Sequence, residues 1–178
     1  MSVYSGDVFR LLCLGNFGSP SATVIRKSIF DCVGGFDPSL RVAEDTELFH
    51  RLATFSPAAI LMKSLVKCRI GQTDTLTGPS NTLICLRNAL QSLEGARSRR
   101  GLLTDDEDKA WRCGRQQLFL ELAYARLANF DAAGTREALI AYQAVGGGTN
   151  FKASALRVLS YLPAAVLRML HAGKRMAV

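Results

Sequence analysis

The chain has 178 residues, 48% of them hydrophobic, and its 22 basic and 15 acidic side chains give a formal net charge of +7. This composition excludes a largely disordered chain, because enough apolar side chains are present to form a core. The length excludes two full catalytic lobes and favours one domain with an appendage.

The first predicted elements lie before residue 40. Residues 24–25, a valine and an isoleucine, favour a brief strand, and Ser28 is expected to cap the helix that follows. The glycine pair 34–35 should end that helix, because glycine adopts the left-handed conformation without steric cost. Asp37 and Pro38 then begin a turn.

A second helix is expected over residues 44–55. Apolar side chains at helical spacing predict a buried face that Asp45 heads. Glu47 is placed to pair with Arg51 one turn later, since residues four apart are neighbours on a helix surface.

The next segments carry a strand pattern and then a helical one. Two short apolar runs, 58–62 and 65–70, are interpreted as strands or strand-like segments, and residues 71–79 as a polar loop. From Ser80 leucines recur at helical spacing, so we expect a helix that ends at Gly101.

The rest of the chain is helical in pattern. Thr104 and Glu107 match a capping box, so a long helix should begin there. A turn at 129–131 leads to another helix through Tyr142, and glycines 146–148 precede one last amphipathic helix. We therefore predict an α/β, helix-rich fold in which a few short strands are followed by an α-helical C-terminal region.

Five cysteines are odd in number and contain no Cys-x-x-Cys pair, so they indicate neither a disulfide framework nor a zinc site. We expect all of them to be buried free thiols in a reducing compartment. They are Cys13, Cys32, Cys68, Cys85 and Cys113.

The excess of positive charge is concentrated at the end of the chain. From residue 150 onward there is no Asp or Glu, and a basic tail of this kind favours anionic partners. The basic residues there are Lys152, Arg157, Arg168, Lys174 and Arg175. The apolar run 158–167 is too short to span a bilayer, so we expect a cytoplasmic protein that is peripheral at the inner face of the membrane.

One motif has three parts in a fixed order. First, a helix ends in Gly-Gly-Phe-Asp at 34–37. Second, the acidic pair Glu44 and Asp45 begins the next helix, and Leu-Phe-x-Arg-Leu-Ala follows it. Third, Arg69 lies in a later apolar run. The arrangement resembles the acceptor-side half of the catalytic domain of family 2 glycosyltransferases, which have the GT-A fold. The resemblance covers roughly residues 16–77, about a third of the chain.

The resemblance implies a role for each motif residue. Asp45 would be the general base, taking the proton of an acceptor hydroxyl as its oxygen attacks the anomeric carbon opposite the leaving diphosphate. Glu44 and Asp37 would contact the acceptor, and Arg69 the diphosphate. A carboxylate in a first helical turn is also an ordinary stabiliser of the helix end, which is the alternative interpretation of Asp45.

The resemblance also implies a donor-binding half that would precede residue 16. In the family that half holds a divalent metal, Mg²⁺ or Mn²⁺, through an Asp-x-Asp motif. The Asp-x-Asp at 106–108 lies inside the predicted capping box, so we expect no metal ligand set in this chain. His50 and His171 are expected to be ordinary surface residues.

The sequence therefore divides by function into two parts. Residues 1–79 are predicted to form the acceptor-binding and catalytic-base half of an inverting glycosyltransferase, inactive without its donor half. Residues 80–178 are predicted to form a helical region with a basic amphipathic tail. The implied partners are a nucleotide sugar, a glycan or lipid-linked acceptor and a donor-domain partner.

Two other functions remain open. Residues 123–142 loosely resemble one tetratricopeptide-type hairpin, which favours a helical protein-interaction module, although such arrays generally need about three units. The basic final helix alternatively favours a protein that binds an anionic membrane surface. Aromatic and basic residues do not interleave, which argues against nucleic acid.

Overall fold

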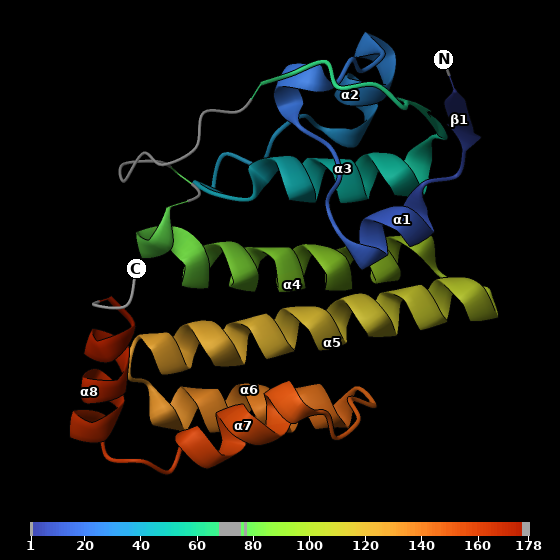
Figure 1. The fold of residues 1–178 in the computed structure, drawn as a ribbon. Helices are drawn as coiled ribbons and strands as arrows, with labels where there is room; N and C mark the ends of the chain where they lie inside the picture. Colours follow the sequence, from blue (N-terminus) through green and yellow to red (C-terminus); the bar gives the residue numbers. More distant parts are fainter. Residues whose placement is uncertain (1, 68–75, 77, 176–178) are drawn as a thin grey trace. The chain divides into compact units, whose positions relative to one another are not determined.

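The structure is a computed structural model (Figure 1) that describes residues 2–67, 76 and 78–175, with the backbone alone for residues 170–175. The described chain is rich in helices and has one small antiparallel sheet. The predicted helix-rich fold with short strands is thus confirmed in its coarse form. The chain divides into two compact units, Met1–Gly114 and Arg115–Val178.

The elements of each unit follow in chain order. The first unit contains β1 (Val3–Gly6), α1 (Phe9–Leu14), η1 (Pro20–Ala22), α2 (Lys27–Val33), α3 (Glu44–Phe55), β2 (Ala58–Leu61), η2 (Pro79–Asn81), α4 (Thr82–Arg100) and the start of α5 (Asp105–Ala128). The second unit contains the rest of α5, α6 (Ala132–Ala144), α7 (Phe151–Leu159) and α8 (Ala164–Arg175).

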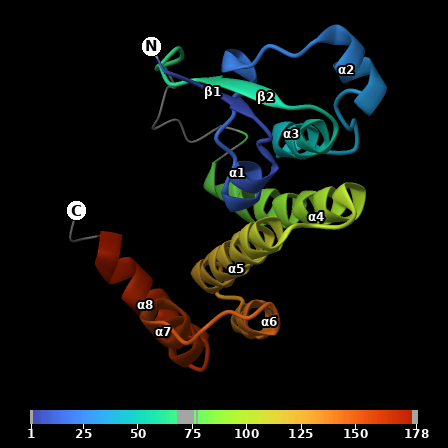
Figure 2. The ribbon, with the colours of Figure 1, turned by 90° about the vertical axis from the view of Figure 1, so that its right-hand side faces the viewer.

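The sheet joins two segments that are far apart in the sequence. β1 pairs antiparallel with β2, so that Val3 lies opposite Leu61 and Gly6 opposite Ala58 (Figure 2). The predicted strand at 24–25 is wrong: Val24 is 99% exposed and the segment has no strand partner among the described residues. Residues 65–67 also lie outside any strand, and the rest of that predicted strand lies outside the described residues.

The core of the first unit forms around α3, which packs against α1, α2 and α4. Leu48 and Phe49 of α3 are buried, as is Leu93 of α4. The start of α5 joins this core, because the indole N–H of Trp111 donates to the Leu93 carbonyl at 3.2 Å. At Gly114 a Cβ atom would lie 1.9 Å from the Cys13 carbonyl oxygen, so only glycine permits this approach of α5 to α1.

Local chemistry sets the helix boundaries. α2 ends at Gly34, and Gly34 and Gly35 have φ angles of 90° and 71°, which confirms the predicted glycine stop. Ser28 does not cap this helix, because α2 begins at Lys27 and its N-cap residue is Arg26. The position that needs a capping side chain therefore comes two residues before the serine.

The capping box at the start of α5 is confirmed. The backbone N–H of Thr104 donates to the Glu107 carboxylate at 2.8 Å, and the Glu107 N–H donates to the Thr104 hydroxyl at 3.3 Å. Arg100 adds a hydrogen bond of 2.6 Å to the same carboxylate. Burial alone would raise the pKa of Glu107, but the hydrogen bonds from Thr104 and Arg100 lower it below its ordinary value.

In the second unit the sequence predicts one final helix and the structure has two. α7 ends at Leu159 and α8 begins at Ala164, with Pro163 between them. Proline lacks the backbone N–H that would continue α7, and its carbonyl accepts from the Leu167 N–H at 3.1 Å to begin α8. None of the helices in the described part of the chain is long and apolar enough to cross a membrane.

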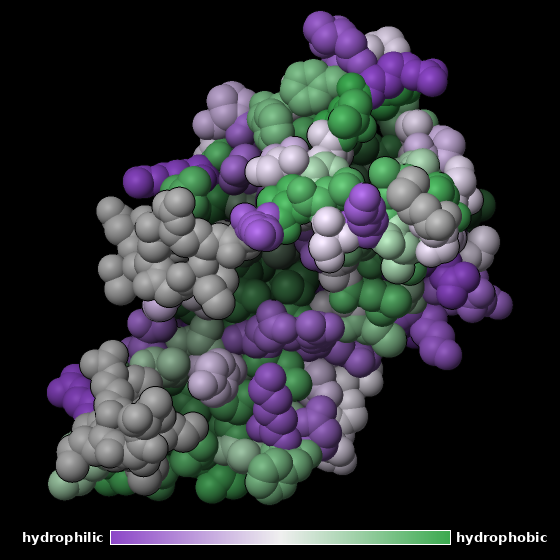
Figure 3. All heavy atoms as spheres, turned by 45° about the horizontal axis from the view of Figure 1, so that its top comes forward, coloured by the Kyte–Doolittle hydropathy of each residue, from purple (hydrophilic) through white to green (hydrophobic). Residues whose placement is uncertain are grey.

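Apolar side chains remain at the surface of the first unit. Phe17 is 50% exposed and Met62 is 67% exposed, and the face of the molecule in Figure 3 shows hydrophobic residues between hydrophilic ones. α4, predicted as part of the C-terminal helical region, packs on α3 in the first unit. The predicted functional division into residues 1–79 and residues 80–178 remains a prediction.

Candidate functional site

The first turn of α3 begins from a strained residue. Ala43 precedes the helix with φ 61° and ψ 22°, in the left-handed region that residues with a Cβ rarely adopt. Ala43 also provides no side-chain cap, and Glu44 and Asp45 follow directly. Backbone strain of this kind concentrates at functional sites, so the outlier marks the acidic pair as a candidate site.

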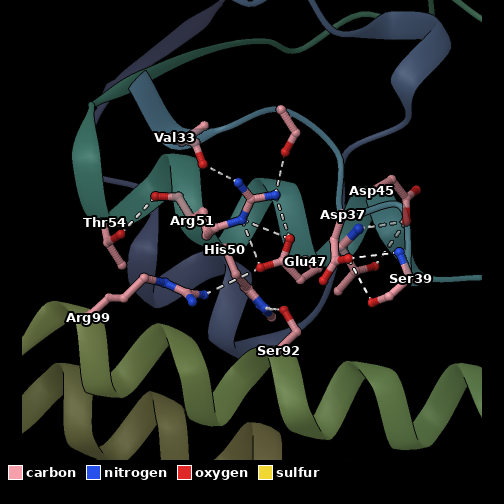
Figure 4. Close-up of polar contacts among 12 residues, drawn as sticks. Val33, Asp37, Ser39, Asp45, Glu47, His50, Arg51, Thr54, Ser92 and Arg99 are labelled. Carbon is pink, nitrogen blue, oxygen red and sulfur yellow. Dashed lines mark hydrogen bonds and ion pairs between the residues drawn. The ribbon is translucent and has the colours of Figure 1, made fainter. Parts of the chain in front are cut away.

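Asp45 is half-buried, and one of its two carboxylate oxygens is held by its neighbour. Oδ1 accepts from the Thr46 backbone N–H at 2.6 Å and lies 3.3 Å from the Thr46 hydroxyl (Figure 4). The side-chain amide of Asn16 donates to that hydroxyl at 2.9 Å. No donor to Oδ2 is found among the described residues.

The start of α4 lies beside the acidic pair. Asn88 donates from its side-chain amide to the Val42 carbonyl at 2.9 Å, which fixes the backbone just before α3. Burial raises the pKa of the Cys85 thiol, and the negative charges of Asp45 and Glu44 raise it further. The hydrogen bond from Asn88 to Val42 places this part of α4 next to the start of α3.

A shallow depression of about 320 Å³ lies next to α3. Its lining combines the Gly-Gly-Phe-Asp motif with a half-buried ion pair of α3: Gly34, Gly35, Phe36, Asp37, Pro38, Glu47 and Arg51. Asp45 is not in the lining, although Figure 4 shows Asp37 and Asp45 toward the same end of α3. The motif residues therefore form a concave surface, and the predicted base lies beside it.

Asp37 is one of two acidic residues in the wall of the depression, and Glu47 is the other. Its Oδ1 accepts from the Ser39 N–H at 2.9 Å and from the Ser39 hydroxyl at 2.7 Å. The hydrogen bonds from Ser39, together with the positive charge of Arg51, lower the pKa of Asp37 below its ordinary value. Asp37 is thus a fixed, ionised acceptor of hydrogen bonds.

Arg51 ties this wall to α3. Its Nε donates to both Glu47 oxygens at 2.8 Å, which confirms the predicted pair. Its terminal nitrogens donate to the carbonyls of Val33 and Gly35, the second at 2.5 Å. Both charged side chains are only 15% exposed, so Arg51 is a structural clamp and not a group free to bind substrate.

The structure brings some of the predicted site residues together. Glu44 and Asp45 share the first turn of α3, and Asp37 lies in the depression beside that helix. Arg69 lies outside the described residues, so its predicted contact with a diphosphate stays a prediction. Sequence reasoning missed Asn16, whose Oδ1 accepts from the Gly18 N–H at 2.9 Å; an Asn two residues before a Gly is the signal that could have found this turn.

His50 is buried, so the prediction of a surface histidine is wrong. Only 4% of its surface is exposed, and it lies in the core that α3 forms with α1 and α4. Its Nε2 lies 3.3 Å from the Leu12 carbonyl and its Nδ1 lies 2.6 Å from the Ser92 hydroxyl. The carbonyl can only accept, so the neutral ring carries its proton on Nε2 and accepts from Ser92.

The residues described here do not fit a catalytic metal. No group of three or more His, Cys, Asp or Glu side chains able to hold one occurs in the described part of the chain. In the Asp-x-Asp at 106–108, Asp106 lies 3.2 Å from Arg10 and Asp108 pairs with Arg97 and Arg112. These carboxylates form ion pairs with arginines at the start of α5, so they are not arranged as metal ligands.

Comparisons with known proteins identify no relative of this chain. No protein-family model, no curated protein and no solved structure gives a significant match to the chain.

Proposed function

We propose that this chain is the acceptor-binding and catalytic-base part of an inverting glycosyltransferase of the GT-A type. The donor would be a nucleotide sugar and the acceptor a hydroxyl of a glycan or lipid-linked glycan. The observation that carries the proposal is Asp45, a half-buried carboxylate in the first turn of α3 with one oxygen held by Thr46 and the other without a donor among the described residues.

The geometry suits a general base. The hydrogen bond to Oδ1 fixes the carboxylate at the N-terminal end of α3, where a base can be held in position. In the proposed reaction Oδ2 takes the acceptor proton while the acceptor oxygen bonds to the anomeric carbon. The bond from that carbon to the diphosphate breaks on the opposite side, and the anomeric configuration is inverted.

The depression gives the acceptor a place beside this base. Asp37, held ionised by Ser39, would accept hydrogen bonds from sugar hydroxyls, and Glu44 would bind from the helix end. The open side of the depression suits a sugar, since its polar surface can stay partly in water. Arg51 would act only by keeping the Gly-Gly-Phe-Asp wall in position.

Features of the first unit support a further donor-binding half. The sheet has two strands, neither outer edge of which is paired among the described residues, and apolar side chains such as Phe17 and Met62 lie at the surface. Unpaired strand edges and exposed apolar surface are typical places where more protein packs. In the proposal that half binds the nucleotide and Mg²⁺ or Mn²⁺, and Arg69 helps to hold the diphosphate.

A transfer assay with product analysis tests the proposal. The chain would be combined with its donor-binding half, either joined to it in the complete protein or added separately, and incubated with nucleotide sugars and glycan or lipid-linked acceptors. We expect a glycoside whose anomeric configuration, measured by nuclear magnetic resonance, is opposite to that of the donor. A product that retains the configuration, or no product with any donor, would contradict the proposal.

A further inference from the structure

α7 has an apolar face that the described residues of its unit leave exposed. Its inner face is buried, since Leu156 is 4% exposed and Ser160, just after the helix, is 1% exposed. Phe151 and Val158 are two helical turns apart on the opposite side, and they are 90% and 67% exposed. Tyr161 follows at 72% exposed. A helix normally exposes polar residues on its outer side, so this second apolar stripe requires an explanation.

Positive charge lies on both sides of the stripe. Lys152 and Arg157 are exposed, and at 100° per residue they fall on opposite flanks of the line from Phe151 to Val158. Residues 138–178 contain no Asp or Glu. Neither cation forms an ion pair within the described part of the chain; Lys152 lies 5.9 Å from the centre of the Tyr124 ring.

α8 repeats the combination of apolar and basic residues. Leu167 is 7% exposed and holds the helix to its unit, whereas Met169 is 75% exposed and Val166 is 38% exposed. Arg168 lies between them in the sequence and is also exposed. The helix has 12 residues, which is far shorter than the roughly 20 that span a bilayer.

We propose that the outer faces of α7 and α8 bind the surface of a membrane that contains anionic phospholipid. The apolar side chains would enter the boundary between headgroups and acyl chains, and Lys152, Arg157 and Arg168 would lie near lipid phosphates. A purely polyanionic partner such as nucleic acid would match the charge but would leave Phe151 and Val158 in water. This inference does not depend on the proposed transferase activity.

Vesicle flotation with the full chain tests the inference. We expect binding to vesicles of phosphatidylcholine mixed with phosphatidylglycerol, weak or no binding to phosphatidylcholine alone, and loss of binding as salt is raised. Equal binding to both vesicles, or binding to neither, would overturn it. Flotation measures lipid binding alone, so a negative result would overturn this inference without bearing on sugar transfer.

The apolar stripe has a matched control. The double substitution Phe151→Ser and Val158→Ser should weaken partition to the anionic vesicles by about tenfold or more, because the apolar area then lost is large. Val24→Ser with Leu102→Ser changes two apolar residues of the first unit that are both 99% exposed, and it should leave partition unchanged. Circular dichroism checks that each variant is folded. Equal losses in the two variants would overturn the inference.

The flanking charges are tested in the same way. Lys152→Gln with Arg157→Gln should weaken binding by about tenfold, whereas Lys63→Gln with Lys67→Gln, two exposed lysines of the first unit, should not. A single-stranded oligonucleotide serves as the competing ligand. If the oligonucleotide binds and the vesicles do not, nucleic acid is the partner and the membrane inference is wrong.

Discussion

Both carboxylate oxygens of Glu47 lie 2.8 Å from Nε of Arg51, one helical turn further along α3. The same guanidinium donates to the carbonyls of Val33 and Gly35 at the end of α2. Arg99 of α4 also lies 3.8 Å from Glu47. One ion pair thus joins three helices and supports the wall of the depression.

Removing this clamp should destabilise the protein. Arg51→Met leaves the Glu47 carboxylate largely buried without its main partner and leaves the Val33 and Gly35 carbonyls without their donor. We expect the free energy of unfolding, measured with urea, to fall by about 2 to 3 kcal/mol. Lys27→Met is the control: it removes an ion pair with Asp31 of the same helical spacing, but one that is 84% and 55% exposed. That change should cost no more than about 0.5 kcal/mol, and similar losses in both variants would contradict the clamp.

The buried histidine should make stability depend on pH. Burial lowers the pKa of His50 below its ordinary value of 6.5, and the positive charge of Arg99 lowers it further, against a hydrogen bond to Leu12 and the charge of Glu47. Between the lowered pKa and 6.5 the unfolded chain binds more protons than the folded one, so stability falls as the pH drops through this range. Above pH 6.5 the contribution of His50 is constant.

A substitution isolates this effect. His50→Gln retains a donor and an acceptor but does not titrate, so the loss of unfolding free energy between about pH 6.5 and pH 5 should become smaller. Urea unfolding at several pH values measures it. Asp37 and Glu107, whose pKa values are lowered, lose their contributions only at more acidic pH. An unchanged slope in the variant would show that His50 is not the group responsible.

The cysteines should differ in reactivity. Burial raises the pKa of Cys13 to about 12, and the charge of Glu107 raises it as well, so its thiolate is scarce at neutral pH. Cys32 and Cys113 are exposed. Iodoacetamide labelling followed by peptide mass spectrometry should therefore modify Cys32 and Cys113 first and Cys13 only when urea unfolds the chain. Early labelling of Cys13 in the folded protein would contradict its position in the core.

That pattern corrects the prediction of uniformly buried thiols. Cys13 is buried and Cys85 is half-buried, whereas Cys32 and Cys113 lie on the outer faces of α2 and α5; Cys68 lies outside the described residues. A cysteine's sequence neighbours do not reveal which side of a helix packs. Cysteine is often buried as a residue type, but this tendency does not determine the burial of a particular cysteine.

Local features that depend only on residues close together in the sequence were predicted correctly. The glycine stop after α2, the Glu47 pair with Arg51 and the capping box at Thr104 each depend on residues within four positions of one another, so the sequence carries the whole interaction. The first turn of α3 at Glu44 was found for the same reason.

Features that depend on distant partners were missed. β1 has four residues, mostly exposed, and forms only because β2 pairs with it from more than fifty residues further on. The approach of Asn88 to Val42 and the burial of His50 likewise need α4 to pack on α3. No local pattern predicts the left-handed Ala43, since alanine has no preference for that conformation.

The role of Asp45 is tested most directly by the transfer rate of Asp45→Asn in the complete protein with its donor half, compared with Asp105→Asn. Asp105 is also an acidic residue in a first helical turn, at the start of α5, so both changes remove the same helix-end stabilisation. We expect kcat to fall by about a hundredfold or more for Asp45→Asn, with the free energy of unfolding little changed, and to stay near the original value for Asp105→Asn. Equal transfer rates in the two variants would contradict it, and Asp45 would then be only a stabiliser of its helix.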